Sequence, residues 1–454
     1  MSNRPNIILI NCDDLGYGDL GCYGSQINRT PAIDNLAEDG LRLTDFYMAS
    51  PVCSPSRAAM LTGCYPPRIS FGEFDGRWVL FPGQAWGLNP NEMTIAKLLK
   101  GAGYKTKLVG KWHCGDQKEF LPTKHGFDSY YGIPYSNDMG IQNEGDVYPP
   151  LPLVLDEAVI EAQPDQASVT QRYLEESVRF IRDNKDEPFF LYFAHMYVHL
   201  PLIVPDRFLR ESQNGRYGAA VECIDWATAV IMHELKALGL DEDTLVIFTS
   251  DNGSRARGEG GSNDPLREHK GTTWEGGQRV PCIMRWPAKI PAGSVRNEIT
   301  SAIDFLPTIA AQCDLDLPQD RMIDGQDLSP LLQDENVLEP PRDTFFYYLQ
   351  NNIEAVRSGK WKLHVYKRDH AINELYDLEA DVGETNNVYD QHPDIVQALM
   401  DKIEACRRDI GDDASGVKGE NIRPKGHVDN PVTLTNFDPE HPYFVAMYDL
   451  KDRG

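Results

Sequence analysis

Short apolar runs alternate with amphipathic segments along the first 250 residues. Four runs are rich in aliphatic or aromatic residues and are bounded by polar ones, which is typical of buried strands: 6–11, 105–109, 188–194 and 244–249. Helical periodicity occupies three further segments: 91–102, 168–183 and 218–238. Strands that are separated by helices predict an α/β fold with a large, mostly parallel sheet sandwiched by helices.

The pattern changes near residue 340. Three strand-like runs lie close together at 344–349, 354–357 and 361–366. The connection Ser358-Gly359 between the last two is tight, which favours an antiparallel meander.

One amphipathic segment follows the meander. It covers 393–408 and places Ile395, Leu399 and Ile403 on one face of a predicted helix. The tail from residue 411 is rich in Gly and Pro, so we expect it to be mostly irregular.

The length of the chain supports a division into two parts. Its 454 residues exceed the roughly 250 to 300 residues at which one hydrophobic core usually stops growing. We therefore expect a large α/β domain at 1–339. A smaller C-terminal α+β subdomain at 340–454 would contain the antiparallel sheet and the irregular tail.

The acidic balance of the chain limits its partners. Lys and Arg number 44, whereas Asp and Glu number 69, which gives a formal net charge of -25. This charge argues against nucleic acid and against an anionic membrane surface as partners. An anionic substrate would need a local cluster of Lys, Arg and metal to attract it.

Two further features bear on the compartment. No run approaches the roughly 20 apolar residues of a membrane span, and the N-terminus lacks the pattern of a signal peptide. The sequence as it stands predicts a cytoplasmic protein, or a periplasmic or secreted one if a leader has been removed. The nine cysteines are scattered, which favours reduced, mostly buried thiols, with one or two disulfides as the alternative.

Polar residues follow each of the four predicted strands. In chain order they are Asp13 and Asp14, then Lys111 and His113, then His195 and His199, and finally Asp251 and Asn252. Because ligand sites in open α/β sheets lie beyond the carboxyl ends of the strands, we expect these residues to converge on one crevice. The Asp and Asn side chains offer only oxygen ligands, which suit Ca²⁺ or Mg²⁺ and not zinc. Any one of them alone is more often a turn former.

The stretch 50–68, SPVCSPSRAAMLTGCYPPR, places Cys53 before a segment with good helix propensity. Prolines flank Cys53, so we expect the helix to begin just after it, with Ser54 or Ser56 as its cap. The positive end of such a helix favours an anion. From the residues alone, Cys53 is either a thiolate nucleophile activated by the helix end and Arg57, or a buried structural thiol.

A third interpretation of Cys53 comes from resemblance. Cys53-Ser54-Pro55-Ser56-Arg57, followed by Leu61-Thr62-Gly63, resembles the sulfatase signature Cys-x-Pro-Ser-Arg with its downstream Leu-Thr-Gly. In that family a formylglycine-generating maturation enzyme oxidises the cysteine, and the hydrated aldehyde is the nucleophile. The resemblance therefore implies that Cys53 is the precursor of the reacting group.

Other segments resemble sulfatase motifs as well. Five of them are 13–14 and 250–253, which match the family's metal site, and 110–113, 199–201 and 269–277, which match its Gly-Lys-Trp-His, His-x-Pro and Lys-Gly-x-x-x-Glu-Gly-Gly segments. Three more extend the resemblance to nearly the whole chain: 108–142, 358–363 and 374–378. The first of these three is similar to the arylsulfatase A and N-acetylgalactosamine-6-sulfatase branch in particular.

The resemblance implies an alkaline-phosphatase-like fold and a set of groups that bind the sulfuryl group. Ca²⁺ or Mg²⁺ would be held by the four Asp and Asn residues and by modified Cys53. Lys111, Lys270 and Arg57 would stabilise charge on the transferring group. Asp251 would bridge the metal and the nucleophile.

The resemblance also implies roles for two histidines. His199, together with Lys270, would protonate the leaving alcohol, and His113 would take a proton from the formylglycine hydroxyl. His195 has no clear counterpart in the family. We expect it either to line the leaving-group pocket or merely to pack.

These features predict a sulfatase that hydrolyses aryl sulfates or sulfated sugars to an alcohol and inorganic sulfate. A phosphate or phosphonate ester hydrolase of the same superfamily is the main alternative, and a non-catalytic binder of sulfated glycans is another. Substrate choice is expected to depend on an outer pocket that includes Trp78, Phe81, Trp86 and the segment 255–267.

Overall fold

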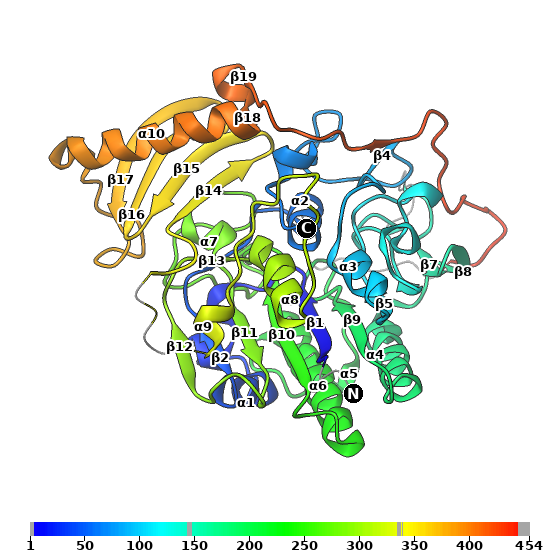
Figure 1. The fold of residues 1–454 in the computed structure, drawn as a ribbon. Coiled ribbons are helices and arrows are strands. Elements are labelled where there is room, and N and C mark those ends of the chain that lie inside the picture. The colour runs from blue at the N-terminus through cyan, green and yellow to red at the C-terminus, as the bar shows by residue number, and fades with distance from the viewer. Residues whose placement is uncertain (1–3, 143–147, 334–336, 338, 444–454) are drawn as a thin grey trace.

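A ten-stranded mixed sheet forms the centre of the protein in the computed structural model, which describes residues 4–142, 148–333, 337 and 339–443 (Figure 1). The strands lie in the order β12 (Ser294–Arg296), β2 (Leu41–Leu43), β11 (Cys282–Arg285), β10 (Thr244–Ser250), β1 (Asn6–Cys12), β9 (Phe189–Ala194), β5 (Lys105–Gly110), β6 (Ser129–Gly132), β7 (Pro152–Leu155) and β8 (Ala158–Ala162). The five strands from β10 to β6 are parallel. Antiparallel pairs flank them on both sides.

The four predicted strands are confirmed as β1, β5, β9 and β10, and they are neighbours in the parallel centre. All seven residues of β1 are buried, because both faces of the sheet are covered. Ile8 and Ile10 point into one hydrophobic cluster and Ile7 and Leu9 into another. This burial on both faces explains why the sequence of the strand is a nearly continuous apolar run.

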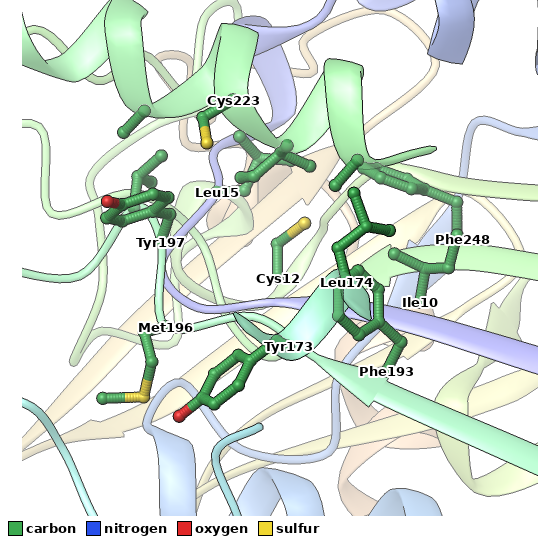
Figure 2. Close-up of a cluster of buried hydrophobic side chains, with 14 of the residues drawn as sticks. Ile10, Cys12, Leu15, Tyr173, Leu174, Phe193, Met196, Tyr197, Cys223 and Phe248 are labelled. Carbon is green, nitrogen blue, oxygen red and sulfur yellow. The ribbon is translucent and has the colours of Figure 1, made fainter. Parts of the chain in front are cut away.

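Helices cover each face of the sheet. One face packs against α1 (Pro31–Glu38), α4 (Gln166–Asp183) and α6 (Gly215–Leu238). The other packs against α2 (Cys53–Thr62), α3 (Ile95–Gly101) and α8 (Phe305–Gln312). Figure 2 shows part of the first cluster, in which Cys12 at the end of β1 lies among Leu15, Phe193 and Cys223. The predicted fold class is therefore confirmed.

The C-terminal part is a four-stranded antiparallel sheet with one long helix across it (Figure 1). The strands are β14 (Thr344–Leu349), β15 (Asn352–Ser358), β16 (Trp361–Lys367) and β17 (His370–Asp377), and the helix is α10 (Pro393–Ile410). Leu399 and Ile403 of α10 are buried against the sheet, as the amphipathic pattern predicts. The boundary between residues 339 and 340 stays a prediction.

The tail after α10 returns to the larger part of the molecule. It is mostly irregular, as expected, with short strands β18 (Gly411–Asp412), β19 (Val417–Lys418) and β20 (Gly426–His427). Strand β20 pairs with β4 (Trp86–Gly87). Residues 444–454 of the expected tail lie outside the described part. The remaining short elements are β3 (Phe46–Tyr47), β13 (Thr300–Ser301), α5 (Asp206–Leu209), α7 (Glu275–Gln278) and α9 (Ser329–Gln333).

A buried charge network joins the C-terminal sheet to α7. The carboxylate of Glu275 accepts hydrogen bonds from Lys362 Nζ at 2.9 Å, from the Tyr347 hydroxyl at 2.8 Å and from the Tyr47 hydroxyl at 2.6 Å. Glu384 Oε1 lies 2.9 Å from Lys362 Nζ and 2.7 Å from His364 Nε2. We call this set the Glu275 network: Glu275, Lys362, Glu384, His364, Tyr347 and Tyr47.

The cysteines and helices agree with two expectations. All nine cysteines are free thiols, and all but Cys22 are buried. None of the helices in the described residues is long and apolar enough to cross a membrane.

Candidate active site

The polar residues that follow the central strands meet at the carboxyl end of the sheet, as expected. Asp13 and Asp14 follow β1, and the Asp14 amide donates a hydrogen bond to Asp251 Oδ1 at 3.2 Å. Asn252 Nδ2 donates to Asp14 Oδ1 at 2.7 Å, and His199 Nε2 lies 3.9 Å from Asp14 Oδ2. Asp14 has a left-handed backbone (φ 64°), an unusual conformation that is often retained at functional sites.

Cys53 is the first residue of α2, so its expected place at a helix start is confirmed, whereas the predicted cap by Ser54 or Ser56 is wrong. The cap position is Val52, which offers no side-chain hydrogen bond. Ser54 Oγ instead accepts a hydrogen bond from the Leu80 amide, and Ser56 Oγ donates one to the Asp251 carbonyl. Both serines therefore fix the helix start against neighbouring segments.

The Cys53 thiol points at the acids. Its Sγ lies 3.6 Å from Asp13 Oδ1, and only 2% of the residue is exposed. Burial raises the pKa of the thiol well above its ordinary value, although Lys111 and Lys270 act in the opposite direction. A reactive thiolate, one of the three interpretations of Cys53, is therefore disfavoured in this site.

Arg57 lies behind the acids, outside the pocket. Its guanidinium binds Asp251 Oδ2 through Nε at 2.8 Å and donates to the Lys111 carbonyl at 3.1 Å. The side chain is fully buried and does not line the cavity next to Cys53. The structure therefore favours a positioning role for Arg57, through Asp251, over the predicted contact with a sulfuryl group.

Two lysines reach the acid pair from opposite sides. Lys111 Nζ lies 2.6 Å from Asp13 Oδ2, and Lys270 Nζ lies 2.9 Å from Asp14 Oδ2. Although burial acts to lower them, the pKa values of both lysines are raised, because the carboxylates favour the charged form. Both lysines therefore stay protonated. Lys111 also donates to Ser136 Oγ at 2.7 Å, a neighbour that the sequence motifs did not indicate.

Gly271 brings the Lys270 loop close to the Cys53 loop. Its amide donates to the Pro51 carbonyl at 2.9 Å, and its φ of +80° is one that side-chain-bearing residues rarely adopt. A Cβ at this position would also meet the ring of Trp78 at 3.2 Å. The glycine thus permits the close approach of the Lys270 loop to the Cys53 loop.

His113 faces the pocket with one free ring nitrogen. Its Nε2 lies 3.0 Å from the Leu80 carbonyl and therefore carries the proton, whereas Nδ1 is buried without a hydrogen-bond partner. Burial, followed by Lys111, lowers its pKa well below the ordinary value. The ring is therefore neutral at pH 7, and Nδ1 can accept a proton.

His199 is held in one orientation by Asn137. The Asn137 amide nitrogen donates to Gln166 Oε1 at 2.9 Å, which leaves its oxygen facing His199 Nδ1 at 3.2 Å. Nδ1 also lies 2.7 Å from the Leu200 carbonyl, so it is a donor and Nε2 faces the site. Burial, followed by Lys270, lowers the pKa of His199 to about 4.

His195 is not part of this arrangement. It is fully buried, and its ring packs edge-on against Phe193 with the ring centroids 4.4 Å apart. Both of its ring nitrogens lack hydrogen-bond partners. It does not line the pocket. Of the two expectations for His195, the structure therefore favours packing.

The acid cluster suits a hard divalent cation. Ligand atoms of Asp13, Asp14, Cys53 and His199 lie within 4.8 Å of one another. Asn252 Oδ1 is buried there without a hydrogen-bond partner, as expected of an oxygen that is available to a metal. The donor set is dominated by carboxylate and amide oxygens, so it fits Ca²⁺ or Mg²⁺.

A pocket of about 220 Å³ opens next to Cys53. It is lined by Val52, Cys53, Trp78, Val79, His113, Ser136, Asp138, Met139, His199, Arg255, Arg257, Lys270 and Gly271. Of the predicted outer-pocket residues, Trp78 and two arginines of the segment 255–267 are therefore present, whereas Phe81 and Trp86 are absent. A larger groove of about 430 Å³ lies near Asp412 and contains none of these residues.

Comparison with known proteins identifies the family. A sequence model described as "Sulfatase" matches residues 5–315, and one described as "N-sulphoglucosamine sulphohydrolase, C-terminal" matches 269–409. N-acetylgalactosamine-6-sulfatase of Rattus norvegicus is 41% identical over 80% of this chain and 71% of its own length. The chain belongs to the sulfatase family. Arylsulfatase A of Homo sapiens is 38% identical over 88% of this chain and 87% of its own length, so the predicted branch is also confirmed.

Solved structures agree with this assignment. The PsFucS1 sulfatase from Pseudoalteromonas sp. is 29% identical, with a TM-score of 0.80 over 89% of this chain and 91% of that one. Ps i-CgsB in complex with k-i-k-neocarrahexaose is 31% identical, with a TM-score of 0.78 over 88% of this chain and 92% of that one. A phosphonate monoester hydrolase of Agrobacterium radiobacter, at 21% identity and a TM-score of 0.64, shows the shared fold alone.

The family membership establishes the reaction class. The protein is a sulfuric ester hydrolase, as predicted, and the phosphonate ester alternative has only a distant structural neighbour. Sulfatases generally use a formylglycine and a divalent metal. The acids around Cys53 offer a suitable place for such an ion.

Proposed function

We propose that this sulfatase hydrolyses a sulfate ester of a sugar and that its reacting side chain is the formylglycine formed from Cys53. The observation that carries the proposal is the position of Cys53, which lies at a helix start beside Asp13 and lines a pocket shared with Lys270, His113 and His199. A sugar ester is favoured by two relatives, the N-acetylgalactosamine-6-sulfatase and the Ps i-CgsB structure in complex with k-i-k-neocarrahexaose.

Maturation must precede folding. Only 2% of Cys53 is exposed, and residues on both sides of it are buried, so an oxidising enzyme cannot reach its side chain in the folded protein. We therefore expect a formylglycine-generating enzyme to act on the chain before α2 packs.

The sulfate group is proposed to bind between the two lysines. Lys111 and Lys270 keep their protons and provide charged donors to the sulfate oxygens, and Ser136 Oγ adds a third polar group. A Ca²⁺ or Mg²⁺ ion held by Asp13, Asp14, Asp251 and Asn252 would supply further neutralisation of negative charge. Arg57 would hold Asp251 in position from behind.

His113 is proposed as the base on the nucleophile side. A hydrated formylglycine at position 53 would supply one hydroxyl for attack and a second for release of the bound group. His113 Nδ1 is free and neutral, so it can take a proton from a hydroxyl at this position. The Leu80 carbonyl holds the proton on Nε2 and thereby keeps Nδ1 available.

Lys270 and His199 are proposed to serve the leaving oxygen. Lys270 carries the permanent charge, so it donates a hydrogen bond to that oxygen. His199 is neutral at pH 7 in the free protein, with Nε2 facing the site. The negative charge of a bound ester favours protonation of this nitrogen, which lets His199 deliver the proton to the alcohol.

The test is a rate comparison between matched cysteine variants. Protein co-produced with a maturation enzyme and supplied with Ca²⁺ is assayed on 4-nitrophenyl sulfate, on 4-nitrophenyl phosphate and on a panel of monosulfated sugars. We expect turnover of sulfates over the phosphate. Cys53→Ala should abolish it, whereas Cys223→Ala, a buried control on α6, should retain it. Retained activity of Cys53→Ala would contradict the mechanism, and faster turnover of the phosphate would contradict the substrate class.

A further inference from the structure

Asp138 is a carboxylate in the pocket that the mechanism above does not use. Among the lining residues of the described chain it is the one carboxylate, and it shares the pocket with the cations Lys270, Arg255 and Arg257. Its Oδ1 is buried and accepts no hydrogen bond, and the residue is 5% exposed. By contrast, Asp13, Asp14 and Asp251 each contact a lysine or an arginine.

The loop around Asp138 is held rigidly. Strand β6 leads into three consecutive polar residues, of which Ser136 contacts Lys111 and Asn137 contacts His199. The Asn137 carbonyl accepts a hydrogen bond from Gln142 Nε2 at 2.9 Å, and its side chain is bound to Gln166. The first two residues of the run therefore support site residues, while the third lines the pocket and has one carboxylate oxygen without a hydrogen-bond partner.

An unpaired buried acceptor needs a partner. Leaving it without one costs free energy, and the cost is larger for a charged group, so a ligand that supplies a donor gains affinity. Burial raises the pKa of Asp138, with His199 and Lys270 acting in the opposite direction, which agrees with a carboxyl that has no paired cation. The sulfate cannot be this partner, because a carboxylate repels it and the two lysines attract it.

The lining of the pocket also includes apolar side chains. Trp78 lies beside Gly271, together with Val79 and Met139, and the Arg368 guanidinium lies over the Trp78 ring, 5.2 Å from its centroid. An aromatic face together with a fixed polar acceptor suits a sugar ring, which has an apolar C–H surface and hydroxyl groups at its edge.

We propose that Asp138 is a specificity-determining residue that accepts a hydrogen bond from a hydroxyl or amide N–H of the sugar ring, adjacent to the sulfate ester. The inference rests on the proposed function and names the substrate feature that the same site recognises. It also implies that a second sulfate at the recognised position is rejected, because two anions would then face each other.

The test removes the same interaction from the enzyme and from the substrate. Wild type, Asp138→Asn and Asp138→Ala are assayed on the best monosulfated sugar and on its deoxy analogues, each lacking one hydroxyl or amide. For one analogue, we expect kcat/KM of the wild type to fall about 10- to 100-fold. Asp138→Ala should show a similar loss on the parent sugar and no further loss on that analogue. Asp138→Asn keeps an oxygen acceptor, so its kcat/KM on the parent sugar should lie between the values of the wild type and of Asp138→Ala.

Controls separate this role from others. 4-Nitrophenyl sulfate has no hydroxyl, so the fold-loss in kcat/KM that Asp138→Ala causes should be about 10- to 100-fold smaller on this ester than on the parent sugar. Asp116→Asn alters a buried carboxylate outside the pocket and should leave the ratio between the substrates unchanged. Thermal melts confirm that the variants fold.

Three outcomes would overturn the inference. An equal loss on the parent sugar and on every analogue would show that Asp138 acts through His199 or through the field of the site. Unchanged rates of the Asp138 variants on all substrates, with an active wild type, would show that the residue has no role and would remove the inference alone. If the wild type cleaves 4-nitrophenyl sulfate but no sugar sulfate, the sugar part of the proposed function fails together with the inference.

Discussion

Lys270 and Glu275, the first residue of α7, lie close together in the sequence but belong to two different buried charge clusters. Lys270 reaches the acids beside Cys53. Glu275 turns the other way and binds Lys362 of the C-terminal sheet at 2.9 Å. We call the first set the Cys53 cluster: Asp13, Asp14, Cys53, Lys111, His113, His199, Asp251, Asn252 and Lys270. The Glu275 network, defined above, is equally buried and contains similar residue types.

The two clusters differ in what is left unpaired. Both oxygens of Glu275 accept hydrogen bonds from protein donors. In the Glu275 network, His364 Nδ1 is the one buried polar side-chain atom without a hydrogen-bond partner. In and around the Cys53 cluster, Asn252 Oδ1, His113 Nδ1 and Asp138 Oδ1 all lack partners. Burying such an atom costs free energy, which a bound ligand can offset by supplying the partner. Of these two clusters, the Cys53 cluster and its surroundings therefore hold more atoms that a ligand could pair.

Glu275→Ala tests the scaffold side and should have the largest effect. Removing the carboxylate leaves Lys362 and two tyrosine hydroxyls without their shared acceptor, which should cost about 3–5 kcal/mol of stability. A thermal melt should show a decrease in Tm of at least about 5 °C. An unchanged Tm would mean that the network does not hold the C-terminal sheet to α7.

Lys270→Ala should lower activity strongly and stability only slightly, the reverse of what we expect for Glu275→Ala. The loss of a charged donor at the sulfate and the leaving oxygen should lower kcat/KM about 10²- to 10³-fold. In the presence of Ca²⁺ its Tm should decrease less than that of Glu275→Ala, because the acids then keep a positive partner. The comparison between the two clusters would fail if Lys270→Ala lost stability and kept its activity.

Metal removal should lower stability through the Cys53 cluster only. After chelation, the two lysines remain as positive partners of the carboxylates in this cluster. Re-addition of Ca²⁺ at about 100 times its Kd should restore about 2.7 kcal/mol of stability. Asp14→Asn is the matched variant, because Asn also tolerates the left-handed backbone at this position. It should respond less to Ca²⁺, whereas Glu275→Ala should respond as the wild type does. A calcium response that survives in Asp14→Asn would place the ion elsewhere.

Asn137→Leu tests a positioning contact and should lower kcat about tenfold. The Asn137 oxygen favours a proton-bearing His199, so its loss should lower the pKa of that ring further. The limb of the pH–kcat profile on which activity falls with rising pH should therefore move to lower pH. A uniform loss of kcat with no shift of that limb would indicate a packing defect only.

Lys367 lies beside the Glu275 network without belonging to it, with its Nζ 3.6 Å from Glu354 Oε2, and its substitution should have the smallest effect. Burial lowers its pKa to about 7, so between pH 7 and its ordinary value near 10.5 the unfolded chain binds more protons than the folded one. Stability should therefore rise with pH across this window, by at most about 1.4 kcal/mol per unit, and less because the side chain is partly exposed. Denaturant unfolding of Lys367→Met should lack this rise. The same slope in Lys367→Met would assign it to another group.

Much of the fold is predictable because its signals are local. Strands β1, β9 and β10 are buried on both faces, so their apolar runs mark them without reference to the rest of the chain. The start of α2 was not predictable from its prolines. Pro55 falls at the third helical position, where the amide has no acceptor inside the helix, so the helix begins at Cys53.

The site was predictable only where a motif carries it. The Asp pair, the lysines and the histidines follow strands or match family segments, so their convergence could be expected. Asp138 and Asn137 lie in a loop whose role depends on contacts with His199 and the pocket. No local pattern indicates such contacts. Glu275 was visible in a motif, yet its partner Lys362 comes from a distant strand, so the division of the motif between two clusters required the structure.

The most direct test compares the chemical state of residue 53 with the rate of hydrolysis. Preparations made with increasing amounts of maturation enzyme are digested. Mass spectrometry of the peptide containing residue 53 then gives the fractions that carry the thiol and the aldehyde. The account predicts that kcat for the monosulfated sugar increases in proportion to the aldehyde fraction and extrapolates to zero at none. Full activity in a preparation that carries only the unmodified cysteine would contradict it.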